Sequence, residues 1–177
     1  MDLAEAFRNH REKIVNKWVE YTLSTYESSS FFKRERDKFA NPVGGNTREA
    51  LNTLFGLLAK GAETEELLAP LEQVILIRSI QDMAPSVAVG VIHAVKHITR
   101  EVLGKDKERA HLVAELYDFE FAVDLAVLAA FDLYMQCRER LYQVRIKEIK
   151  TGTHILTESK CPSSLLKDTV QPIDPGK

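Results

Sequence analysis

The stretch FAVDLAVLAAFDLYM, Phe121 to Met135, is the most apolar part of this sequence and predicts a buried helix at the centre of the fold. Apolar residues continue on both sides of it at steps of three and four, the spacing of one helical face. The pattern runs from about Lys107 to about Lys150. Such a helix would approach roughly 65 Å at about 1.5 Å per residue. The stretch is shorter than the ~20 residues of a membrane helix and contains Asp124 and Asp132, so we expect no membrane insertion.

The end of this helix, CRERLYQVRIKEIK, is charged and keeps a narrow apolar stripe through Cys137, Leu141 and Val144. It should extend past the core, where a second chain could cover the stripe. We therefore predict a homodimer with these three residues at the interface. The alternative is a frayed, solvated helix end.

Five further helices are predicted upstream, and no convincing strand is evident. Their expected ranges are 2–27, about 31–39, 46–61, about 65–82 and 85–104, where the segment 31–39 is short. The chain is therefore expected to be all-α. Its 177 residues, 45% hydrophobic and 28% charged, suit one domain over residues 1–151. Residues 152–177 are polar and aperiodic and are expected to form a flexible tail.

The stretch FANPVGGNTREAL, residues 39–51, predicts a corner between two helices. Pro42 and the two glycines stop the incoming helix, and Asn46 with Glu49 has the spacing of a capping box for the next one. A phosphate-binding loop is the alternative. It is disfavoured because no strand precedes the glycines and no Gly-Lys-Ser/Thr follows them.

Charge and cysteine content give little indication of partners. The formal net charge of −2 provides no basic excess for nucleic acid. Only Cys137 and Cys161 occur, and no signal segment opens the chain, so a cytoplasmic location is expected.

Two separated motifs resemble the RsbRD N-terminal domain family, known from co-antagonists of the kinase RsbT in bacterial stress signalling. They are FANPVGG at 39–45 and IRSIQDMAPSVAVGVIHAVKHITREVL at 77–103, accompanied by Trp18 and Tyr26. The resemblance covers roughly residues 5–145. It implies a globin-like, non-haem helical bundle that dimerises and passes a signal along its last helix to a STAS domain. Here only the polar tail follows that helix, so we expect a stand-alone sensory module with an unknown regulatory partner.

The RSIQD part of the second motif contains Arg78, Gln81 and Asp82, which continue an apolar helical face. Arg78 and Asp82 are four residues apart and could pair. They could line a pocket for a small-molecule ligand, form a switchable pair, or form a structural ion pair at a helix end.

His93 and His97 are four residues apart, a spacing that lets two imidazoles bind one metal ion. Lys96 and Arg100 share their face, however, and would repel a metal. The pair also points away from the apolar face where a haem ligand should lie. We expect no metal or haem and interpret these four residues as a solvated basic face for an acidic partner.

The remaining motifs do not define a catalytic site. The run ERAH, residues 108–111, has the Glu-x-x-His form of di-iron bundles but occurs once. Asp118, Glu120, Asp124 and Asp132 could accept protons, or pair with Arg78 or the basic face. No nucleophile–base arrangement is visible. We predict a non-enzymatic sensory or regulatory module without a cofactor; the alternative is a small helical metal- or ligand-binding protein with enzymatic activity.

Overall fold

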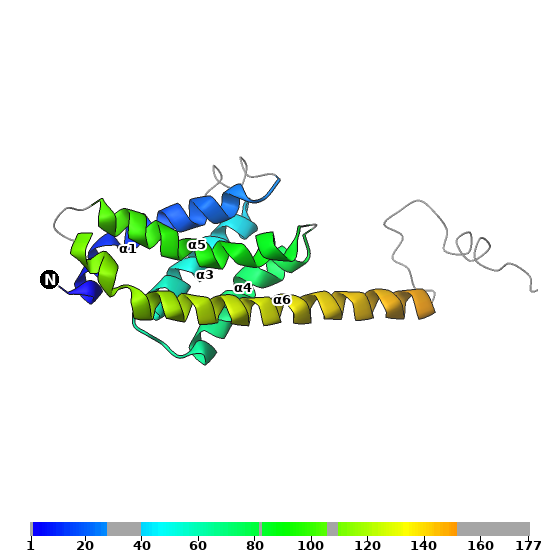
Figure 1. Ribbon diagram of the computed structural model, residues 1–177. Helices are drawn as coiled ribbons and strands as arrows, with labels where there is room; N and C mark the ends of the chain where they lie inside the picture. The colour runs from blue at the N-terminus through cyan, green and yellow to red at the C-terminus, as the bar shows by residue number, and fades with distance from the viewer. Residues whose placement is uncertain (1, 28–39, 82, 106–109, 152–177) are drawn as a thin grey trace, which may run out of the picture. The chain divides into compact units, whose positions relative to one another are not determined.

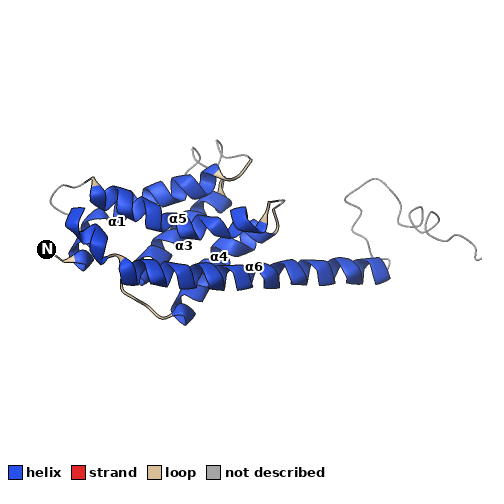
Figure 2. Cartoon of the chain, in the orientation of Figure 1, coloured by secondary structure: helices blue, strands red, loops and turns tan. Residues whose placement is uncertain are grey.

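The computed structural model describes residues 2–27, 40–81, 83–105 and 110–151. In these ranges the chain is helical and contains no strand, which confirms the all-α bundle with a long C-terminal helix (Figures 1 and 2). The predicted helix 31–39, the predicted tail 152–177 and Asp82 lie outside the described residues. The elements are α1 (Leu3–Ser24), α3 (Pro42–Leu58), α4 (Thr64–Ser79), α5 (Pro85–Gly104), the 3₁₀ helix η1 (Ala110–Glu115) and α6 (Tyr117–Thr151).

Residues Met1–Arg138 form one compact unit, in which α1 and α5 lie side by side (Figure 1). The indole N–H of Trp18 on α1 donates to the carbonyl of Val91 on α5 at 2.7 Å, and both residues are buried. This bond satisfies the one polar atom of the tryptophan side chain inside an apolar core. Helix α3 packs against both α1 and α4.

Three phenylalanines from distant parts of the chain meet in this core. The Phe7 ring of α1 lies 5.8 Å from that of Phe55 on α3 and 5.0 Å from that of Phe119 on α6, measured between centroids. Phe55 and Phe119 are 6.2 Å apart. Tilted and edge-to-face pairs of this kind add about 0.5–1.5 kcal/mol each beyond their buried area. The cluster thus joins the start of α6 to α1 and α3.

The corner at residues 39–51 differs from the prediction, because α3 begins at Pro42 and not at Asn46. The N-cap is Asn41, whose Oδ1 accepts from the backbone N–H of Gly44 at 2.7 Å. A residue before proline is held outside the helical region, as an N-cap requires, and proline suits the first helical position. A Cβ on Gly44 would lie 2.2 Å from Asn41 Nδ2, so this glycine leaves room for the cap.

The prediction of one helix from about Lys107 onward was also wrong. Residues Ala110–Glu115 form the 3₁₀ helix η1, and α6 starts only at Tyr117. Leu112 in η1 and Leu116 just after it are both buried, so apolar core positions continue across the junction. The period of the apolar pattern therefore could not separate the two helices. The predicted start of α5 at Pro85 is confirmed.

Helix α6 has 35 residues and faces the core of the first unit with one side. Its buried residues are Phe119, Val123, Ala126, Ala130, Tyr134 and Cys137. The second unit is Glu139–Lys177, and its described residues continue α6 to Thr151. In the part of the chain that the structure describes, no helix has both the length and the hydropathy to cross a membrane.

Candidate functional site

Arg78 is fully buried at the end of α4 and is held by oxygen atoms from two other segments. Its Nε donates to the carbonyl of Ala88 at 2.8 Å, and its Nη2 donates to Val87 O at 3.0 Å and Thr25 Oγ1 at 2.9 Å. Among the described residues no carboxylate forms an ion pair with it. Its expected partner Asp82 lies outside those residues.

The ring of Tyr26 covers the same guanidinium, with Arg78 Cζ 4.9 Å from the ring centroid. Burial raises the pKa of the Tyr26 hydroxyl, and the positive charge of Arg78 offsets part of that rise. Gln81, by contrast, is exposed, so its side chain does not share the buried environment of Arg78. Arg78 connects the C-terminal end of α1, α4 and the first turn of α5.

The basic face of α5 meets acidic residues of α6 in the same chain. Lys96 Nζ lies 2.9 Å from both carboxylate oxygens of Asp124. Arg100 holds Glu120 with two hydrogen bonds, of which the Nη2–Oε2 bond is 2.8 Å. The bond from Arg100 lowers the pKa of the Glu120 carboxyl, and Glu120 raises the pKa of Arg100. These two pairs connect α5 to the first turns of α6.

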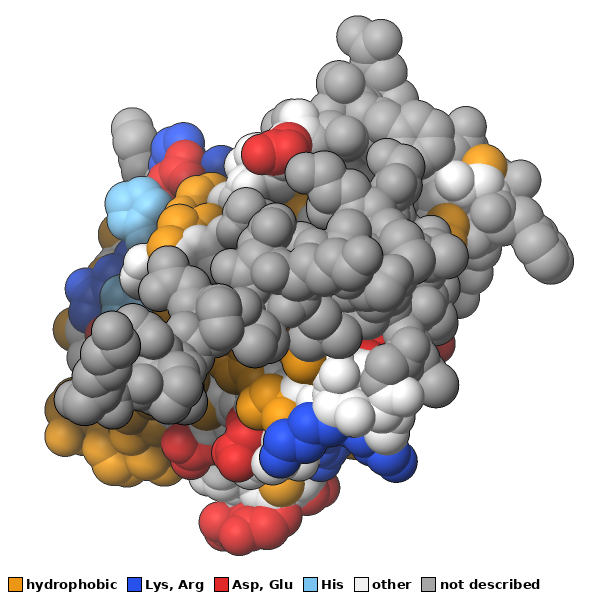
Figure 3. Space-filling view, turned by 90° about the vertical axis from the view of Figure 1, so that its right-hand side faces the viewer, with side chains coloured by type: hydrophobic (Ala, Val, Ile, Leu, Met, Phe, Trp, Pro, Cys, Tyr) orange, Lys and Arg blue, Asp and Glu red, His pale blue; other side chains and the backbone are white. Residues whose placement is uncertain are grey.

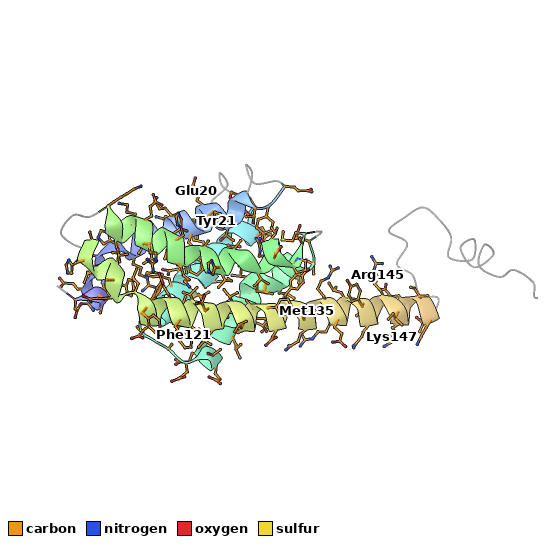
Figure 4. The ribbon with its side chains drawn as sticks, viewed as in Figure 1. Glu20, Tyr21, Phe121, Met135, Arg145 and Lys147 are labelled. Carbon is orange, nitrogen blue, oxygen red and sulfur yellow. The ribbon has the colours of Figure 1, made fainter. Side chains whose placement is uncertain are left out.

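The two histidines of this face have different surroundings. His93 is exposed, and its Nε2 lies 4.0 Å from Asp124 Oδ1. His97 lines a hollow between α1 and α5 that Lys17 and Glu101 cross as an ion pair at 3.0 Å. Tyr21 and Glu20 of α1, marked in Figure 4, border the same hollow. Across residues 2–27, 40–81, 83–105 and 110–151, no three His, Cys, Asp or Glu side chains are grouped to hold a metal ion.

A groove of about 560 Å³ lies between α1 and the start of α3. Arg8 and Arg11 line it from α1, and Gly44, Gly45 and Arg48 line it from α3. The volume is in the range of small-molecule sites. The lining residues of each helix follow helical spacing and so share one face of that helix, and the packing of α1 against α3 brings the two faces together.

Helix α6 carries most of the exposed apolar side chains. Of the sixteen large hydrophobic residues exposed in the described part of the chain, eleven belong to α6. Phe121 and Met135, labelled on α6 in Figure 4, are about half exposed, at 54% and 50%. On the face shown in Figure 3, hydrophobic side chains likewise remain uncovered between charged ones. Exposed apolar residues concentrated on one element indicate a contact surface.

The model of one protein family, described as the RsbT co-antagonist protein RsbRD N-terminal domain, matches residues 12–149 of this chain. The chain belongs to the RsbRD N-terminal domain family. The match covers 138 of the 177 residues and confirms the resemblance seen in the two sequence motifs. Membership makes this chain a signalling or regulatory domain. Neither the search of curated proteins nor that of solved structures found a match.

Sequence reasoning placed some of these residues and missed others. It grouped Lys96 with Arg100, and it named Glu120 and Asp124 as acidic residues that could pair with their face. It missed the contact between Arg78 and Tyr26 and the groove beside Gly44. The groove had a signal in the sequence, because Arg48 follows Gly44 by four residues, but nothing in the sequence indicated that Arg8 lies opposite.

Proposed function

We propose that this RsbRD N-terminal domain is a non-enzymatic regulatory module that forms a homodimer through α6 and passes a signal to another protein. The observation that carries the proposal is the concentration of exposed apolar side chains on α6. A surface of this kind is stabilised when a second chain removes it from water. Family membership supports the regulatory role.

The exposed residues of α6 form two stripes on opposite sides of the helix. Leu141 and Val144, exposed by 36% and 54%, continue the face that is buried further upstream, whereas Cys137 is covered by its own unit. At about 100° per residue, a second stripe lies about 180° away. It repeats every seven residues: Phe121, Leu128, Met135, Tyr142 and Ile149.

The strict repeat of seven favours a helix as the binding partner. An isolated straight helix would let such a stripe drift by about 20° per repeat, and left-handed supercoiling around a second helix removes the drift. A second copy of α6 offers the same repeat. We therefore propose that the second chain packs against this outer stripe; the surface expected at Leu141 and Val144 lies on the opposite side of α6 and is tested separately.

The route by which α6 would respond to the rest of the domain is its contact with α5. Lys96 and Arg100 hold Asp124 and Glu120 there, so a shift of α5 would move the start of α6. His93 and His97 remain exposed on the same helix for a protein partner. Arg78, Gln81 and Asp82 remain the candidate switch, because Arg78 connects α4 to the start of α5.

Sedimentation velocity at tens of micromolar tests the dimer. The unmodified protein should sediment as a dimer, and Leu128→Glu with Met135→Glu should give a folded monomer. The pair Leu141→Glu and Val144→Glu reports on the opposite stripe in the same way. Lys147→Glu changes the net charge by the same amount as each of these double variants. It removes no apolar surface and should leave the dimer intact. A monomeric unmodified protein would overturn the proposal.

A further inference from the structure

The groove between α1 and α3 contains one arginine that is fixed and two that are not. Arg11 is held against α3, because its Nε donates to Asn52 Oδ1 at 3.1 Å and its Nη2 to Asn52 O at 2.8 Å. Arg8 and Arg48 line the same groove and make no hydrogen bond or ion pair with any other described residue. Their guanidinium groups are available to a ligand.

The guanidinium groups of Arg8 and Arg48 favour an anionic ligand. Glu12 and Glu49 also line the groove, so it is not uniformly basic. Neither glutamate pairs with Arg8 or Arg48. A guanidinium binds a carboxylate through two parallel N–H···O bonds.

A smaller hollow of about 150 Å³ adjoins the groove and shares Arg8 and Arg11 with it. Its wall includes Phe7 and Phe55, which are almost fully buried. Gly56 lies beneath Arg11, where an added Cβ would come within 3.0 Å of Arg11 Nη2. A ligand whose acid group reaches Arg8 can therefore place an apolar part against aromatic side chains.

We propose that the groove binds a small organic acid, with its carboxylate between Arg8 and Arg48 and its apolar chain in the hollow beside Phe7 and Phe55. Arg8 and Arg11 lie before position 12, where the family match begins. Such a ligand would be the input of the proposed regulatory module. This role rests on the proposed function, whereas the binding itself does not. Binding can be measured whether or not the chain dimerises.

The test is a titration of ¹⁵N-labelled protein with sodium hexanoate at constant ionic strength, followed by NMR. Saturable shifts are expected at the amides of Gly44, Gly45 and Arg48. Arg8→Gln and Arg48→Gln should each weaken hexanoate binding about tenfold, since one charge-assisted hydrogen bond contributes a factor of this size. Arg145→Gln, an exposed arginine on α6, should have no effect.

Acetate and inorganic phosphate are the comparison ligands. Acetate has the same carboxylate without the chain and should bind more weakly than hexanoate. Equal binding of all three anions would show an adventitious ion only and would overturn the proposal. Absence of saturable shifts at Gly44 and Gly45, or unchanged affinity in both arginine variants, would overturn it as well. Both variants should fold, because both side chains are exposed, and their melting curves check this.

Discussion

Arg78 and Tyr26 form a buried cation–π contact, with the guanidinium carbon 4.9 Å from the ring centroid. The contact joins the residues just after α1 to the end of α4, and the same guanidinium holds the first turn of α5 through Val87 O and Ala88 O. A buried charge is costly unless it is well bonded. Here two carbonyl oxygens, a hydroxyl and an aromatic face replace part of the water that the guanidinium loses, and its Nη1 is buried without a hydrogen-bond partner among the described residues.

The first prediction follows from this arrangement. Arg78→Met keeps much of the side-chain volume but removes the hydrogen bonds to Val87, Ala88 and Thr25, and it should lower the free energy of unfolding by about 3 kcal/mol. Urea denaturation measures the change. Arg48→Met, at an exposed position, should stay within about 0.5 kcal/mol of the unmodified protein. If Arg78→Met were equally harmless, Arg78 would serve a ligand or switch and not the fold.

The second prediction concerns the start of α3. Asn41→Ala removes the N-cap bond to Gly44 and should cost about 1 kcal/mol, whereas Asn46→Ala should be nearly neutral because Asn46 lies exposed inside the helix. Gly44→Ala should also destabilise the protein, since its Cβ would collide with the Asn41 side chain. Thermal melts of the three variants distinguish the two possible caps. If Asn46→Ala were instead the more destabilising of these two variants, Asn46 would be the N-cap, as expected from the sequence.

These positions show how far the sequence could predict the structure. The helical period found α1, α5 and α6, because apolar residues such as Val91 and Val123 repeat on one face over many turns. The start of α3 was missed because Pro42 followed closely by Gly44 and Gly45 is typical of a loop, while Asn41 before Pro42 is equally suited to an N-cap. The groove was missed because Arg8 and Arg48 meet only after α1 and α3 pack together. Periodicity describes single helices and carries no information on which polar faces meet.

The third prediction concerns Glu101, which lies between two lysines at the edge of α1 and α5. The hydrogen bond from Lys105, followed by that from Lys17, lowers the pKa of Glu101 from 4.5 to about 2. Between these values the unfolded chain binds the proton and the folded chain does not. The stability that Glu101 contributes is therefore complete above pH 4.5, falls as the pH approaches 2, and is absent below it.

A carbon-detected NMR titration of the Glu101 carboxyl measures this pKa directly. Lys105→Met should move it toward 4.5 by more than Lys17→Met does, because Lys105 is the larger cause of the shift. A pKa close to 4.5 in the unmodified folded protein would show that neither lysine holds the carboxylate in solution.

The last prediction concerns the contact between α5 and α6. Glu120 lies largely covered beneath Arg100, and Lys96 is close enough to lower its pKa further, so a positive charge at position 120 would face two cations. Arg100→Glu and Glu120→Arg should each lower the melting temperature and speed hydrogen exchange at the start of α6. The double variant exchanges the two charges, restores the attraction and should recover most of both losses.

Arg145→Glu, whose nearest acidic partner is Glu148 at 3.8 Å on α6 itself, controls for net charge and should leave this hydrogen exchange unchanged. If the double variant were no better than the weaker single one, the pair would not hold α6, and a signal could not reach that helix through Arg100.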